Sequence, residues 1–382
     1  MPSIVLVAGD PSGDAHAARL IDALKARDAS LTFSGLGGPA MQRAGMALLD
    51  DLTTTAAIGP FDAARHFARF RAATRRFKEH LTRQRPDLVI LVDFGDFNLP
   101  VIAPIVTSYQ IPLLYYISPQ LWAWGRFRLR YVRRYVDRML VFFKFEEELY
   151  QRAGVPVTWV GHPLVESAKP SLTRDEALQR FGLNPWRRTV GLLPGSRDRE
   201  IARHLPLMLK TAARIAWHMP GVQFLLPKAP SVYRRTLECS LAKAQVDVTV
   251  AEGGMYDALQ LMDVAIVASG TATLDAALCE VPMVVVYKTS WPTYLAARLV
   301  VRVPHIAMVN VVAGRARVPE FIQHRAQPRS IARTVVALLR DEARCAKIQE
   351  GLREVRNRLG PPGAVDRAAE AVQHAIGAAG RS

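Results

Sequence analysis

Cysteine is scarce in this sequence, and its scarcity excludes two kinds of protein. Three cysteines occur in 382 residues, at Cys239, Cys279 and Cys345. Their number is odd and their spacing matches no metal site, so neither a disulfide framework nor a zinc module is expected. They fit unpaired thiols in a reducing cytoplasm.

Long hydrophobic runs are also missing. The longest apolar stretches, such as Leu88–Val92 and Met283–Tyr287, fall far short of the ~20 residues that a membrane-spanning helix needs. The apolar start Met1–Ala8 has no charged leader and runs straight into a Gly-Asp-Pro turn. We therefore interpret it as a first buried strand rather than a secretory signal.

Acidic residues are outnumbered by basic ones. Lys and Arg total 50 against 34 Asp and Glu, which gives a formal net charge of +16. This charge suits an anionic ligand, an acidic membrane surface or nucleic acid, and composition alone does not separate the three.

Short β-branched runs alternate with amphipathic helical stretches, the pattern of parallel sheets covered by crossover helices. The strands predicted from these runs are Ser3–Ala8, Leu31–Gly35, Leu88–Asp93, Leu113–Ile117, Met139–Phe143, Thr158–Val160, Val190–Leu193, Gln223–Leu226, Val246–Val250, Val264–Val267 and Met283–Val286. Turn residues from Gly161 to Arg174 separate two series of strands, which disfavours one continuous sheet. We expect two doubly wound, Rossmann-like α/β domains over residues 1–165 and 166–343, with the ligand in a cleft at the carboxyl ends of the strands. Residues 344–382 have a helical pattern.

Two turns in the second half suit a nucleotide diphosphate. The strand Val190–Leu193 runs into Pro194-Gly195-Ser196-Arg197, where the N–H groups of a helix start and a bidentate guanidinium attract phosphate. The strand Val264–Ala268 runs into Ser269-Gly270-Thr271-Ala272-Thr273, and Asp275 follows, where it could accept hydrogen bonds from ribose hydroxyls. An ordinary strand-to-helix turn explains either segment alone. Two in one domain, without a Gly-x-Gly-x-x-Gly or Walker sequence, favour a nucleotide diphosphate.

The first half offers a candidate general base. Asp93 ends an apolar strand, and partial desolvation at that position raises the pKa of a carboxyl group. An inverting sugar transfer needs one such base to take a proton from the acceptor hydroxyl. Asp96 has the alternative role of capping a helix that begins near Phe97. The loop Gly9-Asp10-Pro11-Ser12-Gly13-Asp14 is a third anion- or sugar-facing turn, unless Asp14 is simply an N-cap.

These residues belong to a longer series of matching stretches, which follow one another in order from one end of the chain to about Gln323. They are Val7–Asp14, Val92–Asn98, Tyr116–Trp124, Phe145-Glu146, Val160–Leu164, Leu192–Arg197, Ser269–Leu274, Pro282–Val285 and Asn310–Arg315. In them the sequence resembles the lipid A disaccharide synthase family, enzymes of Gram-negative bacteria that join two acylated glucosamines on the way to lipopolysaccharide.

The resemblance implies a GT-B fold and an inverting, metal-independent hexosyltransferase without a cofactor. The donor would be UDP-2,3-diacylglucosamine and the acceptor 2,3-diacylglucosamine 1-phosphate, joined β-1,6. The enzyme would be peripheral on the inner face of the inner membrane, and a homodimer is left open. The helices of residues 344–382 would return to the acceptor-binding N-terminal domain.

The resemblance also assigns residues to the site. Asp93 falls on the catalytic aspartate, and Arg197 and Asn310 fall on positions important for activity and diphosphate binding. The nucleotide-sugar site would comprise Gly195, Ser196, Arg197, Ser269, Gly270, Thr271, Ala272, Thr273, Asp275 and Asn310. The acceptor or cleft loops would comprise Asp10, Ser12, Gly13, Asp96, Ser118 and Trp122.

Several positions depart from the family pattern. The usual Glu is replaced by Asp10 and by Asp275, and each substitution retracts the charge by one methylene. Gly95 replaces a Pro, Phe143-Lys144-Phe145 replaces Leu-Pro-Phe, and Met308-Val309 replaces Leu-Pro. Sugar and acyl preferences depend on such contacts, so a UDP-sugar-dependent GT-B enzyme with a different lipid acceptor is the alternative.

Two basic clusters interleave Arg with aromatic residues. Phe67, Arg69, Phe70 and Arg75 belong to the first, whose phenylalanines fall on one side of a predicted helix, as in a segment at a membrane surface. A helix packed on its own sheet through those phenylalanines is the alternative. The second cluster, from Arg126 to Arg138, could bind a phosphorylated lipid acceptor. A nucleic-acid-binding module is the rival from another class, and no helix-turn-helix, zinc-knuckle or RNP sequence supports it.

Overall fold

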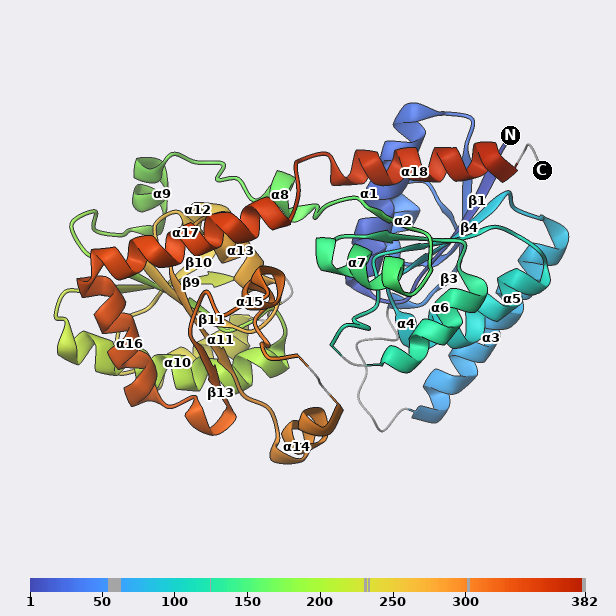
Figure 1. Cartoon of the computed structure of the whole chain (residues 1–382). Helices are drawn as coiled ribbons and strands as arrows, with labels where there is room; N and C mark the ends of the chain where they lie inside the picture. Colours follow the sequence, from blue (N-terminus) through green and yellow to red (C-terminus); the bar gives the residue numbers. More distant parts are fainter. Residues whose placement is uncertain (54–62, 124, 230–231, 233, 301–302, 380–382) are drawn as a thin grey trace. The chain divides into compact units, whose positions relative to one another are not determined.

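The structure, a computed structural model, describes residues 1–53, 63–123, 125–229, 232, 234–300 and 303–379 (Figure 1). The chain forms two compact units. Unit 1 comprises Met1–Pro163 and Gly360–Ser382, and unit 2 comprises Leu164–Leu359. The chain therefore leaves unit 1 within the turn-rich segment and returns to it at Gly360, later than the expected residue 344.

The described strands of unit 1 form one seven-stranded parallel sheet in the order β3-β2-β1-β4-β5-β6-β7. They are β1 (Ser3–Ala8), β2 (Thr32–Gly37), β3 (Ala47–Asp51), β4 (Leu88–Val92), β5 (Leu113–Tyr116), β6 (Arg138–Val141) and β7 (Val157–Trp159). The order reverses between β1 and β4, so a ligand crevice is expected at their carboxyl ends.

Helices cover both faces of this sheet. They are α1 (Pro11–Arg27), α2 (Pro39–Arg43), α3 (Ala63–Arg83), α4 (Gly95–Phe97), η3 (Asn98–Ile102), α5 (Ala103–Ser108), η4 (Arg126–Arg128), α6 (Leu129–Tyr135), α7 (Lys144–Arg152) and α18 (Ala364–Ala379). Alternate residues of β1 point to opposite faces: Val5 and Val7 pack in one core cluster with Phe77 of α3, and Leu6 packs in the other with Leu20 of α1.

The last helix of the chain packs on the first. Ala368, Ala369 and Val372 of α18 share a buried cluster with Leu20 and Ile21 of α1, and the two helices lie side by side (Figure 1). The expected return of the C-terminal helices is therefore present in α18. α17 (Glu342–Arg358) instead contacts α13 (Ala272–Leu278) and α15 (Met308–Ala313) of unit 2.

Unit 2 repeats the architecture. Its described strands form a six-stranded parallel sheet in the order β10-β9-β8-β11-β12-β13. They are β8 (Thr189–Leu193), β9 (Gln223–Lys228), β10 (Thr249–Glu252), β11 (Val264–Ala268), β12 (Met283–Tyr287) and β13 (Glu320–Ile322). The order reverses between β8 and β11, the two strands that precede the predicted phosphate-binding turns.

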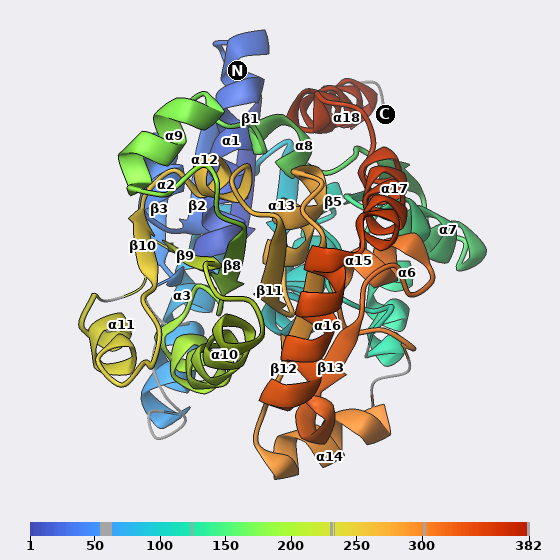
Figure 2. The same ribbon diagram turned by 90° about the vertical axis from the view of Figure 1, so that its left-hand side faces the viewer.

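The remaining helices of unit 2 surround this sheet (Figure 2). They are α8 (Leu164–Ser167), α9 (Arg174–Phe181), α10 (Asp198–His218), α11 (Arg234–Leu241), α12 (Met255–Leu259), α14 (Trp291–Val300), η5 (Gln323–Arg325) and α16 (Pro328–Arg340). α9 shows how local sequence sets the bounds. Thr173 and Glu176 form a capping box at its start, and Gly182 ends it in the left-handed conformation with φ 65°.

All eleven predicted strands are present, whereas β3 and β13 were not predicted. Both are edge strands and neither contains a buried residue, so their sequences carry no apolar run. Two doubly wound Rossmann-like units are therefore the fold, as predicted.

Candidate active site

The loop after β1 is held by its own acid. Asp10 is the N-cap of α1, and its carboxylate accepts a hydrogen bond of 2.6 Å from the buried Gly13 N–H. Ser12 is exposed. A Cβ at Gly9 would lie 2.0 Å from the Phe94 ring, so any side chain there would displace that ring. The predicted loop residues thus form a compact turn against the end of β4.

Asp14 is not an N-cap of this helix, and that alternative is wrong. Its side chain is buried and accepts three backbone hydrogen bonds, of 2.9–3.0 Å, from Gly38, Ala40 and Met41. Asp14 therefore stabilises the N-terminus of α2, where a carboxylate also complements the helix dipole.

Asp93 lies directly after β4 in a strained backbone conformation, with φ 44°. Its carbonyl oxygen accepts hydrogen bonds from the Tyr115 hydroxyl at 2.5 Å and the Asn98 amide at 2.9 Å. These two buried side chains fix the backbone at a residue that would otherwise avoid this conformation, and so fix the position of its carboxyl group.

The electrostatic surroundings of that carboxyl group suit a general base. Burial raises the pKa of Asp93 to about 6, the charge of Asp10 adds to the rise, and an N–H of Phe94 opposes it. Such a group is ionised at neutral pH and still basic enough to accept a proton.

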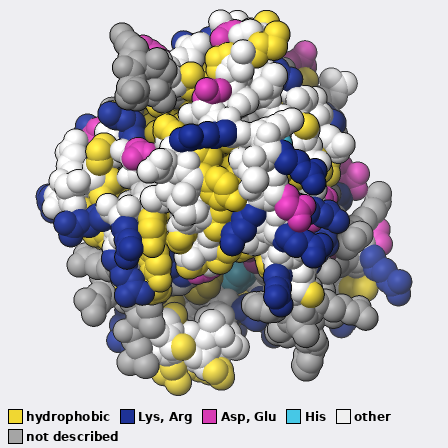
Figure 3. Space-filling model, turned by 90° about the vertical axis from the view of Figure 1, so that its right-hand side faces the viewer, with side chains coloured by type: hydrophobic (Ala, Val, Ile, Leu, Met, Phe, Trp, Pro, Cys, Tyr) yellow, Lys and Arg dark blue, Asp and Glu magenta, His cyan; other side chains and the backbone are white. Residues whose placement is uncertain are grey.

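Asp96 does not cap a helix near Phe97. It lies inside α4, whose N-cap is Phe94, and it forms an ion pair with the buried Arg128. One member of the second basic cluster thus neutralises an acid of the protein itself. The Lys and Arg side chains on the face shown in Figure 3 are likewise interspersed with acidic and apolar ones.

Ser118 faces the protein interior, and the prediction that it lines an acceptor loop has no support in its contacts. Its hydroxyl lies 2.8 Å from the hydroxyl of the buried Tyr150 and 2.9 Å from the Pro119 carbonyl oxygen. Trp122 is partly buried and packs edge-on against Phe145, with the ring centroids 5.4 Å apart.

Glu146, which the sequence analysis did not assign to the site, is the unusual acid of this region. It is buried, and the Phe143 N–H donates to it at 3.3 Å. Burial raises its pKa to about 8, the Phe143 N–H and the polar side chains of Ser118 and Trp122 oppose the rise, and the charge of Asp93 adds to it. The carboxyl group is therefore largely protonated at neutral pH. The sequence shows an acid at this position, but it does not show that the side chain is buried.

Two histidines near the first loop were also missed. Burial and Arg19 lower the pKa of His16 to about 4 against the charge of Asp10, and burial and His16 lower the pKa of His162 to about 3. Both rings pack against Phe142. The neutral imidazole of His16, which senses the charge of Asp10, suits hydroxyl groups better than phosphates.

The membrane residues predicted in α3 are corrected by their packing. Phe70 packs against the rings of Phe94 and Phe97, and Phe77 is fully buried. Arg69 donates to the Asp51 carbonyl oxygen at 2.7 Å. Arg75 is exposed beside Glu79, and the side chain of Phe67 lies outside the described residues. α3 packs on its own sheet through these phenylalanines, the alternative stated above.

In unit 2, the turn after β8 already holds an anionic group. Ser196 N–H donates to Glu200 Oε2 at 3.0 Å, and the largely exposed Arg197 lies 3.3 Å from Glu200 Oε1. Gly195 has φ 120°, and a Cβ there would lie 2.5 Å from Glu200 Oε2. The Ser196 N–H and the Arg197 guanidinium therefore converge on one carboxylate, the arrangement that a phosphate would use.

The turn after β11 offers fewer donors than predicted. The Ser269 hydroxyl donates to the Ile306 carbonyl oxygen and the Thr273 hydroxyl to the Gly270 carbonyl oxygen, each at 2.8 Å. Thr271 and Gly270 are exposed, and Ala272 begins α13. Backbone N–H groups and Thr271 are thus the donors that this turn presents to solvent.

Asp275 lies one turn into α13 and has a partner within unit 2. Its Oδ1 accepts a hydrogen bond of 2.8 Å from the Tyr256 hydroxyl. Burial raises the pKa of Asp275, and the bond from Tyr256 opposes the rise. The shorter acid is therefore tied to a neighbouring tyrosine.

Asn310 cannot bind a diphosphate with its side chain as placed. The amide donates to the Val318 carbonyl oxygen and Glu320 Oε1, at 2.9 and 2.8 Å, and accepts from the N–H groups of Arg317 and Val318, at 2.7 and 3.0 Å. These four bonds use its whole hydrogen-bonding capacity. Asn310 is a buried structural residue that fixes the segment leading into β13.

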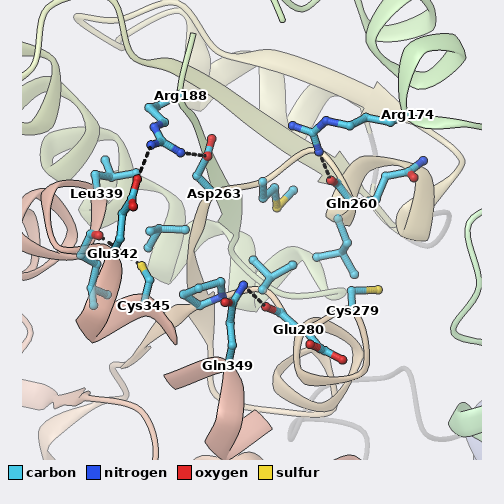
Figure 4. A pocket seen from close by; sticks show the side chains of 16 residues that line it. Arg174, Arg188, Gln260, Asp263, Cys279, Glu280, Leu339, Glu342, Cys345 and Gln349 are labelled. Carbon is cyan, nitrogen blue, oxygen red and sulfur yellow. Dashed lines mark hydrogen bonds and ion pairs between the residues drawn. The ribbon is translucent and has the colours of Figure 1, made fainter. Parts of the chain in front are cut away.

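A pocket of about 370 Å³ lies at the amino ends of the unit 2 strands, at the other end of the sheet from the two predicted phosphate-binding turns (Figure 4). Its lining residues Arg188, Asp263 and Pro282 directly precede β8, β11 and β12, which places the pocket at the amino ends of these strands. Arg188 is paired with Asp263 at 2.7 Å, and Arg174 donates to the Gln260 carbonyl oxygen. The pocket is therefore separate from the predicted donor site.

The described part of the chain contains no group of three or more His, Cys, Asp or Glu side chains placed to hold a metal ion. Among the helices of the described residues, none is long and apolar enough to cross a membrane.

Comparison with known sequences gives matches along nearly the whole chain. The family model described as lipid-A-disaccharide synthetase matches residues 4–375. A lipid-A-disaccharide synthase of Geobacter sulfurreducens is 42% identical over 374 residues, which cover 98% of this chain and 97% of the relative. One from Syntrophus aciditrophicus is 43% identical over 367 residues, which cover 96% of each.

Solved structures show the same fold at low sequence identity. The UDP-GlcNAc 2-epimerase of Neisseria meningitidis bound to UDP-GlcNAc has a TM-score of 0.64 at 14% identity and covers 98% of this chain and 100% of its own. The glycotransferase of kitacinnamycin has a TM-score of 0.62 at 17% identity, with coverages of 98% and 99%.

Proposed function

The chain belongs to the lipid-A-disaccharide synthetase family, and from this premise we propose how its residues carry out the transfer. The enzyme is a glycosyltransferase of the GT-B fold. It transfers 2,3-diacylglucosamine from its UDP donor to 2,3-diacylglucosamine 1-phosphate and forms the β-1,6 disaccharide and UDP.

Asp93 is the general base of this proposal. Its carboxylate takes the proton of the acceptor 6-hydroxyl as that oxygen bonds to the anomeric carbon of the donor. The bond from that carbon to the diphosphate breaks on the opposite side, and UDP leaves with the electron pair. The observation that carries this role is the partly buried carboxyl group directly after β4, whose pKa is raised to about 6 by desolvation.

The turn after β8 binds the diphosphate. Support comes from its contacts with Glu200, because Ser196 N–H and Arg197 already converge on a carboxylate there. A diphosphate carries more charge than that carboxylate and would take over both donors. Thr271 and the backbone of the second turn complete the phosphate contacts. Asp275 would bind the ribose through the carboxylate oxygen that does not accept from Tyr256.

The loop after β1 meets the sugars. His16 near Asp10 is neutral, so this loop has no cation to attract a phosphate. It offers a carboxylate and an uncharged imidazole, both of which can hydrogen-bond to sugar hydroxyl groups. Asn310 acts indirectly, through the segment that it fixes.

The lipid substrates imply a membrane partner. We place the enzyme on the inner face of the inner membrane as a peripheral protein, because both substrates carry acyl groups. The net charge of the protein, +16, also favours contact with anionic lipid.

Incubation with the donor and acceptor in detergent, followed by mass spectrometry, tests this function. We expect the tetra-acylated disaccharide 1-phosphate and UDP, and unchanged activity in excess chelator. UDP-GlcNAc serves as the control donor. Its use in preference to the diacylated donor, with no disaccharide formed from the latter, would support the other transferase and overturn the proposal.

A further inference from the structure

α14 is a helix that the rest of unit 2 does not cover. None of its residues from Trp291 to Arg298 is buried, and the helix stands apart from the rest of the unit in both Figure 1 and Figure 2. An isolated helix of ten residues is marginal in water, since most helices in proteins are stabilised by packing of an apolar face. A surface outside this unit is therefore expected to cover it.

One side of α14 combines apolar and aromatic residues with a cation. Trp291, Tyr294, Leu295 and Arg298 follow the i, i+3, i+4, i+7 spacing of a single helix face. Trp291 is 56% and Leu295 58% exposed, and the Trp291 ring packs edge-on against Tyr294. Large exposed apolar side chains with Trp and Tyr at their edge are typical of helices that lie in a membrane interface.

The N-terminus of α14 is held to unit 2 by hydrogen bonds. Ser290 caps the helix through its contacts with Thr293, at 2.6 Å between the two hydroxyls. Thr289 exchanges two backbone hydrogen bonds with the Gln323 side chain, at 3.0 and 2.9 Å, and Arg203 donates to its hydroxyl. The helix therefore projects from a fixed point, beside the carboxyl end of β12 and the first turns of α10.

The chain around α14 has an unbalanced charge. No Asp or Glu occurs between Glu280 and Glu320, whereas this stretch contains Lys288, Arg298 and Arg302. Its two further cations, Arg315 and Arg317, are paired with Glu354 and do not count toward this charge. Arg298 is exposed on the helix face itself. Such a stretch is complementary to a surface of negative charge, and each basic residue near an anionic bilayer adds to the attraction.

We propose that α14 is an interfacial helix that inserts Trp291 and Leu295 into a bilayer containing anionic phospholipid and so attaches unit 2 to the membrane. The inference rests on the proposed function for its lipid substrates, and it assigns the contact to an element other than α3. A second copy of the chain is a poorer occupant. A helix ~15 Å long with two exposed large apolar residues offers far less than the ~800 Å² that each partner of a stable dimer buries.

Binding to vesicles of phosphatidylethanolamine and phosphatidylglycerol tests the proposal. The double variant Trp291→Ser, Leu295→Ser should bind at least roughly tenfold more weakly than the parent chain, because the inserted apolar area is lost. Trp186→Ser and Trp217→Ser are matched controls, since these residues are 93% and 78% exposed but lie elsewhere in unit 2. They should bind within about twofold of the parent, and Arg298→Glu should bind more weakly only at low salt.

The outcomes separate this inference from the proposed function. Equal vesicle binding by the double variant and the controls overturns the role of α14. So does a double variant that loses self-association or oligonucleotide binding but keeps vesicle binding. Transfer between detergent-dispersed substrates is measured in parallel and should be unchanged in the double variant. If the parent chain forms no disaccharide, the proposed function is overturned, whereas the role of α14 is still decided by the vesicle-binding measurements alone.

Discussion

Asp10 and Asp93 follow two neighbouring parallel strands, and the negative charge of Asp10 raises the pKa of Asp93 beyond the rise that burial already causes. Both residues lie at the reversal point of the unit 1 sheet, where the carboxyl ends of β1 and β4 meet. The loop acid therefore tunes the proposed base as well as capping α1.

Removing the charge of Asp10 should shift the pH dependence of transfer. In Asp10→Asn the repulsion is lost, so the pKa of Asp93 falls from about 6 toward its ordinary value. The rise of kcat/KM with pH should then begin at lower pH than in the parent enzyme. Asn also caps helices, so the thermal midpoint should change little. An acid limb that stays in place would show that the two charges do not interact.

Asp93→Asn should abolish most of the transfer and leave UDP binding nearly intact. Loss of a general base typically costs about 10³-fold in rate. Asn tolerates the positive φ at this position, so the fold should be kept. Calorimetric titration with UDP and turnover with both substrates check this. Equal losses in both would make Asp93 a structural residue.

Arg197→Ala should weaken UDP binding itself. The guanidinium offers charge-assisted hydrogen bonds to the diphosphate, and their loss corresponds to a roughly 10- to 100-fold higher Kd. Arg199→Ala is the matched control, because Arg199 is also exposed and lies two residues further along the same segment. Similar losses in the two variants would point to general charge rather than to a contact by Arg197.

Asn310→Ala should act on stability first. It would leave buried hydrogen-bonding groups of Arg317, Val318 and Glu320 without their partner, at a cost of about 3 kcal/mol in the free energy of unfolding. Urea denaturation measures this cost. A variant of unchanged stability that fails to bind UDP would restore the direct contact that the structure argues against.

Glu146→Gln should stabilise the protein at alkaline pH. The folded-state pKa of about 8 lies above the unfolded value near 4.5, so the folded state holds the proton more tightly. The contribution of the protonated Glu146 carboxyl group to the free energy of unfolding is therefore complete below pH 4.5 and is lost as pH rises from there through 8. Gln cannot ionise, so its advantage over Glu in thermal midpoint should be larger at pH 9 than at pH 5. Glu148→Gln, at an exposed position of the same helix, should show no such trend.

The fold could be predicted because its signal is local. Buried parallel strands are continuous apolar runs, and their order along the chain implies two doubly wound sheets. The two missed strands lie at sheet edges, where half-burial leaves no apolar run. Likewise, Asp93 and Arg197 could be found because they directly follow such runs.

The partners of the other site residues could not be predicted in the same way. Asp14 binds backbone 24 residues away at Gly38, and Asn310 binds the segment into β13. Phe70 and Phe77 had the spacing of either a membrane face or a packed face, and only the sheet beneath them decides. Local sequence states what a side chain can bind, and tertiary packing determines whether that capacity is already used.

The pairing of α1 with α18 has a consequence for synthesis. The apolar side of α1 leaves the ribosome first, whereas Ala368 and Val372, which cover it, follow roughly 350 residues later in the chain. At 5–20 residues per second the interval is roughly 20–70 s, during which unit 2 can fold as one continuous segment. Throughout that interval unit 1 lacks part of its core and exposes a surface that chaperones recognise, so a chain stopped at Leu359 should be aggregation-prone although unit 2 is complete.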